Sequence, residues 1–169
     1  MMRLLGATLV AAGCGWMGFR AAAALGCRVR ALEDMADGLS LLAQEMELDE
    51  PPLPQLMERL ARRCRGPAKL LFRDCRQALD RLEEEDFSRA WRKLVAERRE
   101  LGEEGRQALL PLGDILGRCG CEDQRRGTDS VRRRLTELAA RAEGDRRRQG
   151  KVYQALGLSG GAFLVILLL

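Results

Sequence analysis

The sequence predicts an all-α protein: a membrane-anchored antiparallel helical hairpin or bundle with N- and C-terminal transmembrane helices. Charged residues make up 32% of the chain and aromatic residues only 4%, a balance that disfavours β-sheets. Apolar residues recur at steps of three and four through the middle of the chain, and both ends carry uncharged runs. We therefore expect an N-terminal transmembrane helix (residues 1–27), a cytoplasmic all-helical domain (28–151) and a C-terminal transmembrane helix (152–169).

The first segment is predicted to cross a membrane and to remain in the protein. Residues 4–19 carry no charge, and the alanines after Arg20 extend the run to Leu25. Residues 4–19 alone would form a helix of about 24 Å, but the alanines add length and the Arg20 side chain can reach the headgroups of a core about 30 Å thick. The alternative is a lipoprotein-type cleavage at Ala11-Ala12-Gly13-Cys14. Because the apolar run before it is very short, a retained anchor is favoured.

The last segment is predicted to be the second span. Residues 152–169 contain no charged side chain and would form a helix of about 27 Å, which just crosses a bilayer. A buried helix of a soluble protein is the alternative. Arg28 and Arg30 follow the first span, while residues 146–148 and Lys151 supply basic charge before the second. The positive-inside rule therefore places the middle of the chain in the cytoplasm.

Small residues recur four apart within both predicted spans. They are Ala7, Ala11 and Gly15 in the first and Gly157 and Gly161 in the second. This spacing permits close helix contact, and hence a homo-oligomer, but small residues are also common filler in transmembrane helices. Both interpretations stay open.

The first helix is expected to continue beyond its span into the cytoplasm, to about Glu47. A heptad-like apolar stripe predicts this continuation. The stripe consists of Val29, Leu32, Met35, Ala36, Leu39, Leu42, Ala43 and Met46. The prolines at 51, 52 and 54 then end one helix and begin the next.

Short helices are predicted to follow. One carries apolar residues between Leu56 and Cys64 and ends at Gly66-Pro67, and a second carries residues 70–82. A third is expected to be capped by Asp86 or Ser88 and to bury Trp91. The acidic run at residues 83–86 is interpreted as a solvated helix end.

The remaining cytoplasmic residues predict one more short apolar face and a long final helix. The apolar face lies over residues 109–116, is strained by Pro111 and is closed by glycines at 117 and 120. Whether the helix is straight or broken near Pro111 stays open. Asp123 is expected to cap the final helix, whose apolar spacing continues without a proline into the second span. Two long helices side by side, with short helices at the far end, would form the antiparallel hairpin.

The residue types give little support to an enzyme, a metal site or a nucleic-acid interface. The chain has six cysteines and no histidine, so imidazole acid–base chemistry is excluded. Cys64, Cys75, Cys119 and Cys121 lack the paired C-x-x-C spacing of a zinc site, so reduced thiols are favoured. No glycine-rich phosphate loop or nucleophile–base pair occurs, and no cofactor is expected. The arginine cluster within residues 125–151 favours anionic lipid over nucleic acid, because it adjoins the apolar C-terminal run.

Several stretches occur in an order that resembles one protein family. They are residues 4–19, residues 39–54, the lone Trp91, Leu112-Gly113-Asp114-Ile115-Leu116-Gly117 followed by Asp123-Gln124, and a C-terminal run that includes Leu156-Gly157. Together they resemble the stage III sporulation protein AB family over nearly the whole chain. The family-motif positions are Trp91, Gly113, Leu116, Gly117, Asp123, Gln124, Leu156 and Gly157. Pro111 and the stretch Cys119-Gly120-Cys121 depart from the family pattern.

The resemblance implies a non-catalytic membrane component of the sporulation channel between mother cell and forespore. It places the protein in the mother-cell membrane, with its central domain in the cytoplasm. The family's cytoplasmic fold is similar to the inner-membrane platform protein of type II secretion and type IV pilus systems. The implied partners are therefore a secretion-type ATPase and other channel subunits. The alternative is a passive membrane-tethered coiled-coil scaffold without a motor partner.

Overall fold

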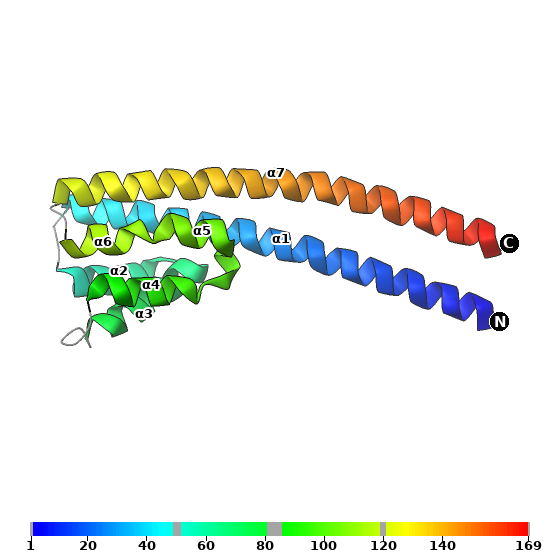
Figure 1. Ribbon diagram of the computed structural model, residues 1–169, viewed down its shortest axis with the longest axis horizontal. Coiled ribbons are helices and arrows are strands. Elements are labelled where there is room, and N and C mark those ends of the chain that lie inside the picture. Colours follow the sequence, from blue (N-terminus) through cyan, green and yellow to red (C-terminus); the bar gives the residue numbers. More distant parts are fainter. Residues whose placement is uncertain (1, 49–51, 81–85, 119–120, 169) are drawn as a thin grey trace. The chain divides into compact units, whose positions relative to one another are not determined.

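Every element that the structure describes is helical (Figure 1). The computed structural model describes the backbone of residues 2–48, 52–80, 86–118 and 121–168, and the side chains of residues 23–47, 52–80, 86–116 and 122–149. In chain order the elements are α1 (Met2–Leu48), α2 (Leu53–Arg63), α3 (Gly66–Leu79), α4 (Phe87–Ala96), the 3-10 turn η1 (Arg99–Leu101), α5 (Gly102–Leu109), α6 (Pro111–Arg118) and α7 (Cys121–Leu168). The all-α prediction is confirmed.

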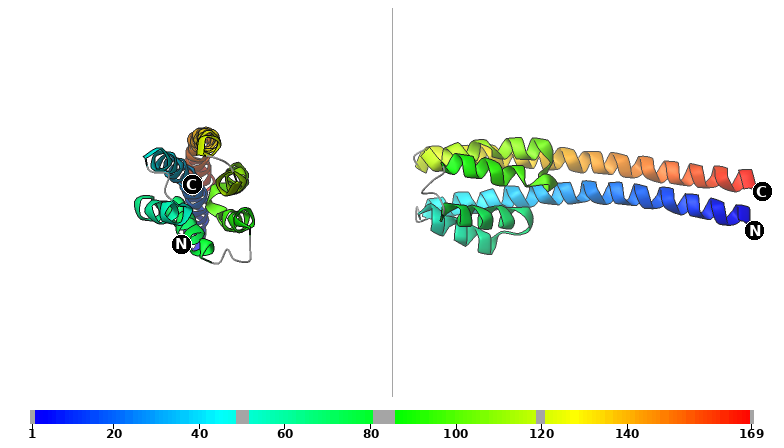
Figure 2. Two further views of the ribbon diagram at one scale, coloured as in Figure 1. Left: turned by 90° about the vertical axis from the view of Figure 1, so that its left-hand side faces the viewer. Right: turned by 60° about the horizontal axis from the view of Figure 1, so that its bottom comes forward.

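The chain divides into two compact units. The terminal unit consists of Met1–Cys27 and Arg141–Leu169, and the helical unit consists of Arg28–Ala140. In the terminal unit the first part of α1 and the last part of α7 run side by side in opposite directions (Figures 1 and 2). Gly26 faces Arg146 there, and a Cβ atom on the glycine would lie 3.6 Å from the guanidinium carbon.

The predicted spans lie mostly outside the side chains that the structure describes. Among the described residues, none of the helices has a stretch of sufficient length and apolar character to cross a bilayer. Residues 4–22 and 152–168 are described only as helical backbone. The small residues Ala7, Ala11, Gly15, Gly157 and Gly161 therefore fall outside the described side chains, as does the motif position Leu156.

In the helical unit, α1 buries the apolar stripe that its sequence predicted, except for the partly exposed Ala43, and the helix ends at Leu48. Leu32, Met35, Leu39 and Leu42 are fully buried. Gly38 lies on the same side of the helix as α3, and a Cβ atom there would lie 2.9 Å from the Ala68 Cβ. Because that distance is shorter than normal carbon contacts, glycine is what allows α1 and α3 to pack this closely.

Helices α2 and α3 form a short pair beside α1 (Figure 2). Pro52 precedes α2 and Pro54 lies in its first turn, where the missing N–H has no helical partner in any case. Cys64 adopts an extended conformation that ends α2 at Arg63. Gly66 has φ +51° and begins α3, so the Gly66-Pro67 sequence opens the next helix.

The structure breaks the helix at Pro111, which the sequence left open: α5 ends at Leu109 and α6 begins at Pro111. Two capping predictions are not confirmed. Asp86 precedes α4 as predicted, yet its side chain makes no capping hydrogen bond, and Ser88 lies inside the helix. The prediction that Asp123 caps the last helix is wrong, because α7 already begins at Cys121. Asp123 instead lies in the first turn, where its charge complements the helix dipole. Cys119 and Gly120 lie outside the described residues.

Candidate functional site

Trp91 is the centre of an interlock that joins α4 to α5 and α6. Its side chain is fully buried, and the indole Nε1 donates a hydrogen bond of 2.9 Å to the carbonyl oxygen of Leu109. In a continuous helix the Leu109 carbonyl would accept a hydrogen bond from the N–H of Gly113. Here α5 ends at Leu109, and the N–H of Gly113 donates to the Leu110 carbonyl oxygen at 3.2 Å. The helix break at Pro111 thus frees an acceptor, which the indole satisfies.

Gly113 lies directly against the indole. A Cβ atom at this position would stand 2.8 Å from Trp91 Cδ1 and 3.0 Å from Cγ. Cβ atoms in folded proteins essentially never approach another heavy atom within 3.0 Å, and a buried ring has little freedom to move away. The two motif positions therefore form one packing unit.

Substituting Gly113 with alanine is expected to destabilise the helical unit by about 1–3 kcal/mol, the usual cost of overpacking a core. The added methyl group would force the indole away from Leu109 and weaken its hydrogen bond. Urea denaturation followed by circular dichroism measures the change. Gly144, where an added Cβ has no neighbour within 4 Å, is the matched control in a helix. Equal stability changes for the two alanine substitutions would contradict this interpretation.

The same stretch of α6 is tied to its neighbours by polar contacts. Ser88 Oγ donates to Asp114 Oδ1 at 2.6 Å, and Arg92 Nη2 lies 3.4 Å from Asp114 Oδ2. Gln124 Nε2 donates to the carbonyl of buried Leu116 at 3.4 Å. The structure thus brings together Trp91, Gly113, Leu116 and Gln124 of the motif positions.

The described contacts of this interlock do not include the other motif positions. Asp123 is exposed at the start of α7. Gly117 lies in α6 and is described only as helical backbone, and so is Gly157 in α7.

Glu45 fastens α2 to α1 and was not singled out by the sequence. The residue is only 6% exposed, yet it carries a carboxylate. Arg59 Nη1 donates to one carboxylate oxygen at 3.2 Å, and Arg63 bonds to the other. Glu45 follows Leu42 by three residues and so lies on the same buried face of the helix. This spacing is the sequence signal that could have predicted a buried carboxylate here.

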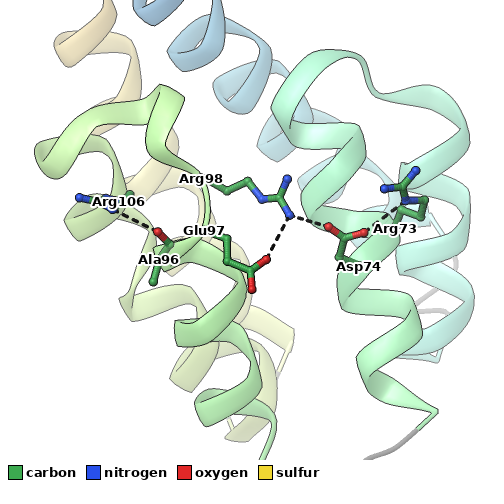
Figure 3. A network of polar contacts seen from close by, with 6 residues as sticks. All are labelled: Arg73, Asp74, Ala96, Glu97, Arg98 and Arg106. Carbon is green, nitrogen blue, oxygen red and sulfur yellow. Dashed lines mark hydrogen bonds and ion pairs between the residues drawn. The ribbon is translucent and has the colours of Figure 1, made fainter.

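A third polar cluster joins α3 to the end of α4 (Figure 3). Arg98 is almost completely buried, and its Nη2 lies 2.5 Å from Asp74 Oδ2 and 3.9 Å from Glu97. Arg73 Nε bonds to the other Asp74 oxygen at 3.2 Å, while Arg106 Nη1 donates to the Ala96 carbonyl at 3.1 Å. These contacts hold α3, α4 and α5 in fixed register.

The two buried thiols are structural rather than reactive. Burial raises the pKa of Cys64 to about 11 and that of Cys75 to about 12. A thiol must lose its proton to act as a nucleophile or a metal ligand, and these pKa values oppose that. Among the described residues, no group of side chains could hold a metal ion. Cys119 and Cys121, which completed the zinc alternative, lie outside the described side chains.

Alkaline pH is expected to weaken the fold through these thiols. In the unfolded chain they lose protons near their ordinary pKa of 9.0, but in the folded protein only near 11 and 12. Their contribution to stability is therefore complete below about pH 9 and is lost as the pH rises toward their folded values. Urea denaturation at about pH 8 and pH 10 should show a larger loss for the native chain than for a Cys64→Ala/Cys75→Ala variant. An equal loss would contradict the prediction.

Comparisons with known proteins identify a family that this chain matches. A family model described as stage III sporulation protein AB matches residues 3–169. The chain is 25% identical over 179 aligned residues to the stage III sporulation protein AB of Bacillus subtilis (strain 168), and the match covers 100% of both chains. A solved structure of a stage III sporulation protein AB is similar with a TM-score of 0.62 and 19% identity. That match covers 72% of this chain and 97% of the other, which supports the fold.

Proposed function

The chain belongs to the stage III sporulation protein AB family, and from this premise we propose that it is a non-catalytic membrane component of the sporulation channel between mother cell and forespore. In this proposal it acts as an inner-membrane platform. Its terminal unit lies in the mother-cell membrane, and its helical unit docks a secretion-type ATPase and other channel subunits from the cytoplasm.

The sequence of the two ends supports the membrane part of the proposal. Residues 4–19 and 152–169 carry no charged side chain, while basic residues stand at the inner flank of each run. Such a distribution is typical of two spans whose connecting segment stays in the cytoplasm. Both runs belong to one compact unit in which α1 and α7 lie together.

The observation that carries the platform part is the set of short helices α2–α6. A passive tether needs only the apolar seam of its long helices. Here five short helices and the 3-10 turn η1 fold onto the long helices and are held by buried polar contacts at Trp91, Glu45 and Arg98. Rigid helix faces of this kind are what a docking partner can recognise.

Binding between the full-length chain in lipid nanodiscs and the purified ATPase tests the platform function. The platform proposal expects saturable binding that empty nanodiscs do not show. Under the tether alternative the ATPase would not bind, and charge reversals on exposed faces of the short helices would leave spore formation intact. That combination would refute the platform function.

A further inference from the structure

In the terminal unit, the uncharged runs of α1 and α7 end at the same level. Gly26 of α1 lies against Arg146 of α7, whose guanidinium carbon would be 3.6 Å from a Cβ atom on the glycine. The two helices run in opposite directions and rise about 1.5 Å per residue (Figures 1 and 2). Six residues back from Gly26 and six residues on from Arg146 therefore reach the same level, to within about one turn. These positions are Arg20, which ends the first uncharged run, and Val152, which begins the second.

Positive charge is concentrated on α7 directly before its uncharged run. The eleven residues before that run contain five basic and two acidic side chains. Glu143 engages two of the cations: its carboxylate oxygens lie 3.3 Å from Arg146 Nη1 and 3.0 Å from Arg147 Nε. Arg141 and Arg148 are exposed and have no hydrogen bond or ion pair with any described residue. The described part of the protein leaves their charge uncompensated.

The adjacent stretch of α1 supplies no acid to these cations. By the register set at Gly26, the four alanines after Arg20 lie beside the basic stretch of α7. Ala23 and Ala24 are exposed, and their short side chains cannot cover an arginine. The first acidic residue of the whole chain is Glu33. An anion that neutralises the cations of α7 must therefore come from outside this stretch of α1.

The distance of each cation from the uncharged run decides whether it can reach lipid headgroups. The headgroup layer adds about 5–8 Å on each side of the hydrocarbon core. Arg148 precedes Val152 by four residues, or about 6 Å of helix, so it falls within that layer. Arg141 precedes Val152 by eleven residues, or about 16 Å, and so stands about one Debye length beyond the layer.

We propose that Arg146, Arg147 and Arg148 form a binding site for the phosphate headgroups of anionic phospholipid in the cytoplasmic leaflet. This assignment rests on the membrane part of the proposed function and specifies the lipid class and the residues that hold it. Glu143 fixes Arg146 and Arg147 in position, while Arg148 contributes the uncompensated charge. The negative surface of that leaflet attracts basic residues next to a membrane span and loses this attraction within a Debye length. The arginines farther from the uncharged run are therefore excluded from the site.

A charge reversal and a matched control on the same helix test the assignment. The test variant is Arg148→Glu and the control is Arg141→Glu. Both arginines are exposed, lie in α7 and have no described partner. Their spacing of seven residues places them on one face of the helix. Since the net charge changes equally, the two variants differ chiefly in distance from the uncharged run.

Lipid preference is measured on the full-length chain in phosphatidylcholine liposomes that contain a trace of spin-labelled lipid. Electron paramagnetic resonance gives the fraction of label that the protein immobilises, for phosphatidylglycerol and for phosphatidylcholine. The native chain should prefer phosphatidylglycerol by about fivefold or more, and salt should weaken that preference. Arg148→Glu should lower the preference by about fivefold, whereas Arg141→Glu should keep it within about twofold of the native value. Circular dichroism checks that all three chains have equal helix content.

Two results would overturn the site while leaving the membrane anchor in place. The first is a native chain without preference for phosphatidylglycerol, or an Arg148→Glu chain that keeps the native preference. The second is an equal loss in Arg148→Glu and Arg141→Glu, which would show that distance from the uncharged run does not select the cations.

Extraction of the liposomes with alkaline carbonate separates these results from failure of the proposed function. A chain with two spans stays with the lipid, so release of the native chain would refute the membrane part of that function. Flotation with phosphatidylglycerol vesicles at low salt would then decide the site. No flotation of the native chain, or equal flotation of native chain and Arg148→Glu, would overturn it. Loss of flotation in Arg148→Glu but not in Arg141→Glu would support it as a site on a peripheral protein.

Discussion

Substituting Trp91 with alanine is expected to lower the free energy of unfolding of the helical unit by about 3–5 kcal/mol. The indole is fully buried, so its removal leaves a cavity among α4, α5 and α6 that close-packed helices cannot fill. It also removes the donor that satisfies the Leu109 carbonyl. Because small domains are stable by only about 5–15 kcal/mol, this change should leave the unit close to unfolding. Urea denaturation of the full-length chain, followed by circular dichroism, measures it.

Trp91→Phe separates the two contributions. Phenylalanine keeps an aromatic ring in the core but leaves the buried carbonyl without its donor, at a cost of about 1–3 kcal/mol. The phenylalanine variant should therefore lie between the native chain and the alanine variant in stability. If the alanine variant lost less than about 1 kcal/mol, Trp91 would not be the centre of the interlock.

The long helices and their buried faces could be predicted from the sequence because local patterns determine them. Apolar residues at steps of three and four between Val29 and Met46 face one side of any helix they form, and that side is buried here. Proline at positions 52, 54 and 111 is incompatible with a helix interior but suits a first turn. The boundaries of α2 and α6 follow from that restriction.

The polar interlocks could not be predicted in the same way, because each pairs residues from helices whose packing is not encoded locally. Asp74 and Arg98 are 24 residues apart, and each occurs in a stretch rich in charge that resembles a solvated helix surface. Only the packing of α3 against the end of α4 buries the arginine. The error at Asp123 is more local: α7 begins at Cys121, three residues before the expected start at Gln124, so a residue suited to capping lies within the first turn.

The motif positions show what a family resemblance supplies beyond local pattern. The helical pattern predicted that Trp91 is buried, but Gly113 was singled out only by the family's order, and periodicity gave no reason to connect the two residues. In the structure the glycine provides the space that the indole fills. An interlock of this kind restricts both residues at once, because a larger side chain at position 113 would displace the indole.

Arg98→Ala is expected to destabilise the helical unit by about 2–3 kcal/mol, the second largest effect. Removing one partner of a buried ion pair leaves the other charge without compensation, which usually costs about 3–5 kcal/mol. Asp74 keeps its contact with Arg73 and is 22% exposed at the side chain, so the loss should lie at or below the lower end of that range. Urea denaturation of the full-length chain gives the value.

A double-mutant cycle with Asp74→Ala shows whether the cost comes from the pair itself. The two single substitutions should each be destabilising, whereas the double variant should lose clearly less than their sum, because neither charge is then left unpaired in the protein. Additive losses would mean that Arg98 stabilises the unit through its packing rather than through Asp74. A measured coupling would establish that α3 is held against the end of α4 by this buried ion pair.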